Sequence, residues 1–205
     1  MVGLPGQGPP FDSRFEAWLA ASAGISRELM ESLQQDNDWA FIIKMHGVME
    51  AGLNHLIRSK LTEPELASVI AHLETNNDKR GKLAFVKAYG LLSTHGISFV
   101  RVMSDLRNRA VHDVKNFNLN LDKYVDSFNQ TQRTNWINAM LWWAGAELEK
   151  LDNNIRDLAI ILPRESIYDG CMFMLMQGFA ESTLPQRLLD ALKERAKPDQ
   201  SNPKK

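Results

Sequence analysis

The segment Leu106–Val114, LRNRAVHDV, places polar side chains of different chemistry within one stretch of helical pattern. Leu106, Ala110 and Val114 recur at every fourth position, so they form one narrow stripe that can face a core. The side chains that point away from that stripe are Arg107, Asn108, Arg109 and His112. With about 100° of rotation per residue, Asn108 and Arg109 lie one turn before His112. The segment is therefore predicted to present a basic, hydrogen-bonding surface.

These residue types suit the cleavage of a phosphodiester. Arginine supplies a permanent planar charge for phosphate oxygens, asparagine orients a hydroxyl or an imidazole, and histidine moves a proton near neutral pH. RNA cleavage by the adjacent 2′-hydroxyl needs a base and a cation but no metal, and Arg107 and His112, five positions apart, supply both. The alternative is a solvated helix face on which Asp105 and Asp113 pair with the basic residues for little energy.

The order R-N-x-x-x-H of Arg107, Asn108 and His112 resembles the signature of the HEPN superfamily, the higher eukaryotes and prokaryotes nucleotide-binding domains. The similarity extends to MHGVMEAGLNHLI, which resembles an earlier helix of the family whose apolar face carries an acidic residue, here Glu50. GKLAFVKAYGLL followed by ISFVRVMSDLRNRAVHDV resembles the corresponding helices of mannitol-repressor-like and related bacterial proteins. The resemblance covers residues from about 38 to 143.

This resemblance implies an antiparallel bundle of four or five core helices that forms a homodimer, with two copies of the motif facing each other across a cleft. In active members this cleft is a metal-independent endoribonuclease site. The resemblance implies that Arg107 stabilises the phosphate, that Asn108 has an orienting role and that His112 acts as base or acid, with Glu50 and Arg109 as supporting residues. Because buried charges are usually paired, Glu50 is equally expected to be a partly buried ion-pair partner of an arginine such as Arg107.

Three functions remain open at this point. The first is an endoribonuclease of the toxin or phage-defence kind, with RNA as substrate and a neutralising antitoxin or regulatory protein as a further partner. The second is a noncatalytic dimeric regulator of the mannitol-repressor-like type, in which the motif serves dimer packing. The third is an RNA-binding module whose phosphate contacts weaken steeply with salt; these contacts would come from Arg101, Arg107, Arg109 and Lys115.

Composition narrows the class of protein. With 205 residues, 44% of them hydrophobic, the chain is long enough for one principal domain with a substantial core. A net charge of -1 gives no overall sign of a protein that binds nucleic acid or membranes, so any binding site of that kind must be local. A single cysteine, Cys171, excludes an internal disulfide and fits a reducing compartment. Because no apolar run reaches roughly 18 to 20 residues and the start does not resemble a secretory signal, we expect a cytoplasmic protein without a membrane partner.

Helical spacing dominates the chain and strand signals are weak, so the predicted fold class is all-α, a helical bundle with a helical C-terminal extension. The predicted helices are FEAWLAASA behind a cap at Asp12, then 26–35, 39–61, 62–74 capped by Thr62, 82–92 ended by STHG, 97–114 and 132–151. In the long helix the predicted core face comprises Phe41, Met45, Val48, Gly52, His55 and Leu56, widened by Ile42, Met49 and Leu53.

The predicted domain order begins with a flexible tail at 1–11 and a HEPN-like bundle at 12–152. It continues with a helical extension at 153–197, which holds a broken apolar region and a charged helix near TLPQRLLDALKERA, and a disordered tail at 198–205.

The other histidines fit structural roles better than chemistry. His46 and His55 lie on or beside the apolar face of the long helix, where hydrogen-bonded core histidines are expected, and His72 and His95 lie near helix ends. No pair of them has the spacing of metal ligands, and the chain has no glycine-rich phosphate loop and no G-x-S-x-G elbow. We therefore predict neither a metal nor a cofactor.

Overall fold

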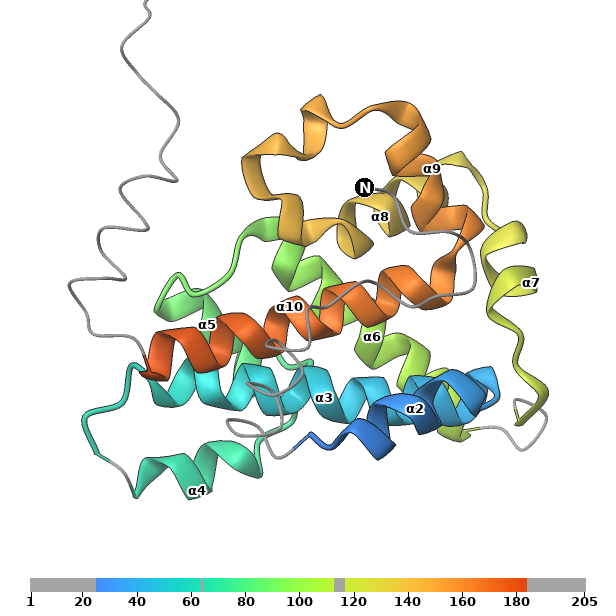
Figure 1. Ribbon diagram of the computed structural model, residues 1–205. Coiled ribbons are helices and arrows are strands. Elements are labelled where there is room, and N and C mark those ends of the chain that lie inside the picture. Colours follow the sequence, from blue (N-terminus) through green and yellow to red (C-terminus); the bar gives the residue numbers. More distant parts are fainter. Residues whose placement is uncertain (1–24, 64, 113–116, 184–205) are drawn as a thin grey trace, which may run out of the picture.

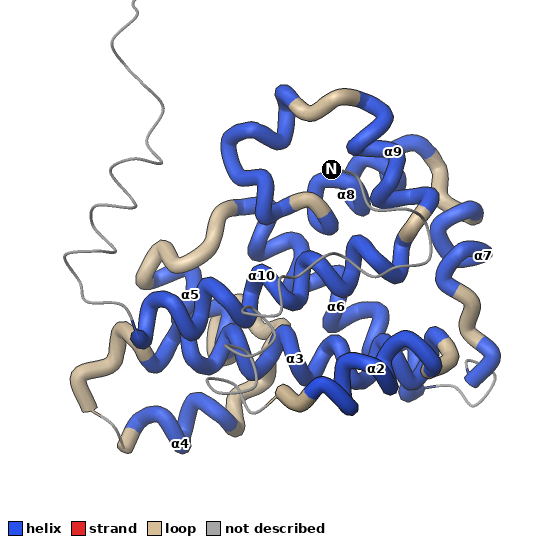
Figure 2. Tube along the Cα trace, in the orientation of Figure 1, coloured by secondary structure: helices blue, strands red, loops and turns tan. Residues whose placement is uncertain are grey.

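A computed structural model describes residues 25–63, 65–112 and 117–183. Within these ranges the regular structure is helical and no strand occurs, as the tube in Figure 2 shows. The all-α prediction is confirmed. None of the helices in these ranges combines the length and the apolar character that a membrane span requires.

The described helices follow one another through short connections (Figure 1). In chain order they are α2 (Arg27–Gln35), α3 (Asp38–Arg58), α4 (Leu66–Ala71), α5 (Lys82–Ala88), α6 (Thr94–His112), α7 (Leu121–Asp126), α8 (Gln130–Met140), the 3-10 segment η2 (Trp142–Lys150), α9 (Asn153–Ile161) and α10 (Pro163–Thr183).

The two longest helices, α3 and α10, lie side by side through the middle of the molecule (Figure 1). Near their first residues, Arg164 Nη1 donates to Asp38 Oδ1 at 2.8 Å, and near their ends the rings of His55 and Phe179 are 3.8 Å apart. The two helices therefore run parallel to each other. They also approach closely, because a Cβ on Gly52 would lie 2.7 Å from the backbone of Leu175.

The predicted core face of α3 is confirmed, with His55 less deeply buried than the rest of that face. The same hydrophobic core includes side chains of α6 and α10. Helix α6 packs across α3 and also contacts α10 through Phe99, and the indole Nε1 of Trp39 donates to the carbonyl of Ala110 at 2.8 Å. This bond holds the C-terminal end of α6 against the first turn of α3, so α3 supports the motif helix.

Helix boundaries differ from the predictions where local turns intervene. The predicted helix 62–74 is shortened to α4, which has no side-chain cap at its start, so Thr62 is not its N-cap. The letters STHG begin a helix instead of ending one, because the hydroxyl of Ser93 accepts from the amide of Gly96 at 3.1 Å in the first turn of α6. The predicted helix 132–151 breaks after α8, where Gly145 has φ 56° inside η2.

Three helices were not predicted as such, and one of them is α9. The segment rich in Asn and Asp after residue 117 contains α7, which is capped by Asn120. The apolar region read as broken is the single helix α10, which packs into the same core as α3. The division into a bundle at 12–152 and an extension at 153–197 stays a prediction.

Several expectations lie outside the described residues. They are the helix from Asp12, the tails at 1–11 and 198–205, Lys115, and the charged helix from residue 184 onward.

Candidate functional site

The motif residues lie at the C-terminal end of α6, and their exposure follows the predicted stripe. Leu106 and Ala110 are buried in the core. The side chains of Arg107, Asn108 and His112 are exposed to solvent. All three predicted site residues are therefore accessible, with Asn108 and His112 one turn apart on the helix. Basic residues near a helix C-terminus also interact favourably with the helix dipole, so part of their role is structural.

Arg107 is held by its neighbour. Its Nη1 donates to the Oδ1 of Asn108 at 3.1 Å, the one side-chain hydrogen bond of the guanidinium among the described residues. Both side chains are exposed, and the bond leaves other N–H groups of the guanidinium free to donate to an anion. Asn108 therefore orients Arg107 without neutralising its charge.

The other predicted cations of α6 have different surroundings. The Cζ of Arg109 lies 5.0 Å from the centre of the Tyr124 ring, so its guanidinium stacks on α7 instead of lying with Arg107. Arg101 pairs with Asp78, which also accepts from Lys87 at 2.8 Å. The hydrogen bond from Lys87, together with the one from Arg101, lowers the pKa of Asp78 below its ordinary value. The charge of Arg101 is therefore already partly balanced by Asp78, which weakens any contact of Arg101 with a phosphate.

Glu50 lies on α3 in a partly buried ion pair. Its Oε1 accepts from Thr75 Oγ1 at 2.7 Å and from Lys82 Nζ, and the side chain of Lys82 is fully buried. The interpretation of Glu50 as an ion-pair partner is thus correct in kind, but the partner is a lysine instead of Arg107. Lys82 is the polar residue that sequence reasoning missed.

The segment before α5 explains how Lys82 reaches Glu50. The amide of Lys82 donates to the carbonyl of Glu74 at 2.9 Å, and a Cβ on Gly81 would lie 2.2 Å from that carbonyl oxygen. Only glycine fits this closed turn without displacing the backbone. The segment 74–82 therefore folds back on itself and directs the first side chain of α5 toward α3.

Burial and neighbouring charges act on the pKa values of both Glu50 and His46. Burial raises the pKa of Glu50, but the hydrogen bonds from Lys82 and Thr75 outweigh it and bring the pKa below its ordinary value. One turn earlier on α3, burial lowers the pKa of His46; the Glu50 charge opposes this, and the charges of Arg107 and Lys82 lower the pKa further. His46 therefore lies within electrostatic reach of both Glu50 and the α6 motif.

The remaining histidines have structural surroundings. His55 is partly buried and its ring contacts Phe179, and burial lowers its pKa. Among the described residues neither His46 nor His55 has a side-chain hydrogen bond, which corrects the expectation of hydrogen-bonded core histidines. In the same ranges no three His, Cys, Asp or Glu side chains are grouped so that they could hold a metal ion.

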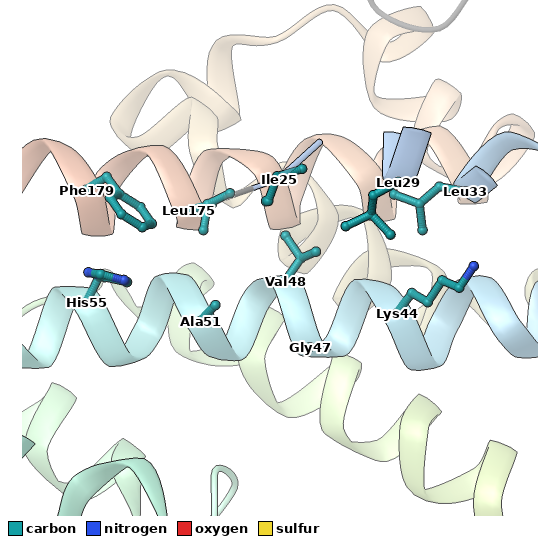
Figure 3. Close-up of a pocket in the computed structure, with 10 residues that line it drawn as sticks. All are labelled: Ile25, Leu29, Leu33, Lys44, Gly47, Val48, Ala51, His55, Leu175 and Phe179. Carbon is teal, nitrogen blue, oxygen red and sulfur yellow. The ribbon is translucent and has the colours of Figure 1, made fainter. Parts of the chain in front are cut away.

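A separate groove lies between α2, α3 and α10, as Figure 3 shows. It has a volume of about 340 Å³ and is lined mainly by apolar side chains such as Leu29, Val48 and Leu175, with Lys44 and His55 toward its ends. Apolar concave sites are where small ligands usually bind. None of the predicted site residues lines this groove, so it is distinct from the surface of α6.

Comparison of the chain with protein-family models, with curated proteins and with solved structures finds no match.

Proposed function

We propose that this protein is a metal-independent endoribonuclease of the HEPN type whose active form is a homodimer. The observation that supports this most directly is the shared exposure of Arg107, Asn108 and His112, with a guanidinium whose charge no carboxylate of the described residues neutralises. Attack of a 2′-hydroxyl on the adjacent phosphodiester requires a cation, an orienting group and a proton acceptor. The exposed guanidinium, amide and imidazole of this motif are groups of these three kinds.

The reaction follows from these groups. His112 accepts the proton of the 2′-hydroxyl, and that oxygen attacks the adjacent phosphorus. The bond from phosphorus to the 5′-oxygen breaks, and the leaving oxygen receives a proton from the protonated His112 of the partner subunit. Arg107 stabilises the negative charge that develops on the phosphoryl oxygens. The products are a 2′,3′-cyclic phosphate and a 5′-hydroxyl, with no net gain or loss of protons.

Two exposed apolar side chains support the dimer. Val111, one turn after Arg107, is 40% exposed, and Phe117, just beyond the helix, is 51% exposed. The ring of Phe117 meets Trp39 edge-on at 5.1 Å, so it is anchored on α3 beside the end of α6. Apolar groups that border a charged motif are suited to contact with a second copy of the same surface. A role as a toxin or in phage defence, a neutralising antitoxin and a cytoplasmic location belong to this proposal.

The test is cleavage of a single-stranded RNA by the purified protein in the presence of a metal chelator. His112→Ala should reduce the rate about a hundredfold or more, as expected for loss of a general acid–base. His72→Ala, which alters an exposed histidine at the C-cap of α4, is the matched control and should cleave normally. Sedimentation should show dimers for both variants. Normal cleavage by His112→Ala, or products that lack a cyclic phosphate, would reject the assignment.

A noncatalytic RNA-binding or regulatory module is the second candidate. The stacking of Arg109 on Tyr124 and the pairing of Arg101 with Asp78 favour it, because cations already engaged by the protein suit a binding surface better than a reacting centre. Binding of RNA without any product, weakening steeply with salt, would select this candidate.

A further inference from the structure

Lys82 is a fully buried lysine in an otherwise apolar environment at the start of α5. Its side chain has 0% exposure, and Leu83 and Val86 of the same helix are buried with it. Removing an ammonium group from water costs several kcal/mol, which an ion pair recovers only in part, so an apolar side chain of similar volume is often as stable or more stable at such a position. Stability alone therefore gives little reason for a lysine here.

The ion pair of Lys82 is connected to α6 through the segment 74–82. Thr75, which donates to Glu50, precedes Asn76, whose Nδ2 donates at 3.5 Å to the Oδ1 of Asp105, two residues before Arg107. Glu50 keeps 31% of its side chain exposed, although both bonds to its Oε1 come from the segment 74–82. One turn earlier on α3, His46 interacts electrostatically with Glu50, with Lys82 and with Arg107 of α6. The Glu50 carboxylate is thus paired with a buried lysine, and through the neighbouring His46 it is electrostatically linked to Arg107 of the proposed site.

A free carboxylate at this place would compete with RNA. Arginine binds carboxylates and phosphates by the same planar pattern of N–H donors, so an unpaired Glu50 would attract the guanidinium that the phosphate needs. In the structure Arg107 instead bonds to the uncharged amide of Asn108. The charge of Glu50 is already balanced by Lys82, and Thr75 occupies the same carboxylate oxygen.

We propose that Lys82 is a positioning residue of the proposed nuclease site: it holds Glu50 within the 74–82 segment, so that the Arg107 guanidinium stays available to the phosphate of RNA. This inference depends on the proposed function for the role it gives to Arg107. Lys82 itself touches neither RNA nor the reacting atoms.

The test replaces Lys82 by methionine, an unbranched apolar side chain of similar length. Lys82→Met leaves Glu50 unpaired and should weaken RNA binding about tenfold, the loss expected when one charge-assisted contact is compromised. The double variant Lys82→Met with Glu50→Gln removes the competing charge and should restore binding. Lys150→Met is the matched control, because Lys150 pairs with Glu147 on η2 and the net charge changes equally. Unchanged binding in Lys82→Met, or no recovery in the double variant, overturns the proposal.

A second readout requires no RNA. The imidazole of His46 can be titrated by nuclear magnetic resonance in the folded protein, and its pKa should rise in Lys82→Met because a lysine charge is lost and the Glu50 charge is no longer balanced. In the double variant the pKa should fall again. An unchanged His46 pKa in Lys82→Met rejects the inference. Absence of RNA cleavage by the native protein, with the His46 shift present, rejects only the proposed function.

Discussion

The packing of α3 against α10 should tolerate no side chain at Gly52. A Cβ there would lie 2.7 Å from both the Cα and the backbone nitrogen of Leu175, and 2.8 Å from the carbonyl carbon of Met174. These are backbone atoms, which cannot rotate away as a side chain does. Since ordinary van der Waals contacts begin near 3.4 Å, Gly52→Ala requires the two helices to separate by several tenths of an ångström.

The expected cost combines two opposite effects. Overpacking a core typically costs about 1–3 kcal/mol, while alanine in a helix gains about 0.5–1 kcal/mol over glycine. Because α3 and α10 are in contact along most of their length, separation loosens many contacts, and we expect Gly52→Ala to lose about 2 kcal/mol net. For a chain of this size such a loss lowers Tm by about 4–8 °C.

The same helix offers a control of opposite sign. Gly47 on α3 is exposed, and a Cβ there would meet nothing within 4 Å, so Gly47→Ala should stabilise the protein by the helix propensity alone, about 0.5–1 kcal/mol. Urea denaturation followed by circular dichroism measures both variants. If Gly52→Ala proved as stable as Gly47→Ala, the close approach of α3 and α10 would be refuted.

Two further predictions concern α10. Burial, together with the Glu165 charge one turn away, raises the pKa of Asp169 from 3.8 to about 6. Between about pH 4 and 6 the carboxyl group of Asp169 therefore stays protonated in the folded state while it is ionised in the unfolded chain. The contribution of Asp169 to the free energy of unfolding declines as the pH rises through this range. Asp169→Asn should stabilise the protein by about 1–2 kcal/mol at pH 7 and not at pH 4, as measured by urea denaturation. An equal gain at both pH values would contradict the raised pKa of Asp169. Arg164→Ala should lower the free energy of unfolding by about 3 kcal/mol, because the guanidinium bonds to Asp38 and lies 4.2 Å from the Phe41 ring centre. Arg164→Lys should recover only part of this loss, because lysine lacks the planar group. Equal Tm values for the two variants would contradict this prediction.

The parts of the fold that could be predicted depend on one-sided burial. Phe41, Met45 and Met49 recur at helical spacing because α3 turns one face to the core, so a local pattern was sufficient. In α10 apolar residues surround the helix, since it packs against α3, α7, α8 and α9, and no periodic face exists to detect. Glycine is a weak helix former, so the glycines of α10 give no local sign of a helix. Gly170 is instead a site of close packing, where a Cβ would lie 2.5 Å from the ring of Phe99.

The same limit applies to the site. Arg107, Asn108 and His112 lie within one helix, so their common surface follows from helix geometry and could be predicted. Lys82 and Glu50 are 32 residues apart, and their pairing depends on the closed turn at Gly81. Nothing local in the sequence marks Lys82 as a buried ion-pair partner, because a lysine at the start of a helix is ordinarily exposed.

The parallel pairing of α3 with α10 has a consequence for biosynthesis. Arg164 and Asp38, which join the starts of the two helices, are 126 positions apart in the chain. During translation the part of α3 that packs against α10 therefore stays uncovered until the ribosome has made nearly all of the described chain, and this nascent intermediate is where aggregation or chaperone binding is expected. The proposed ribonuclease would then reach its folded form only after most of its messenger RNA had been translated.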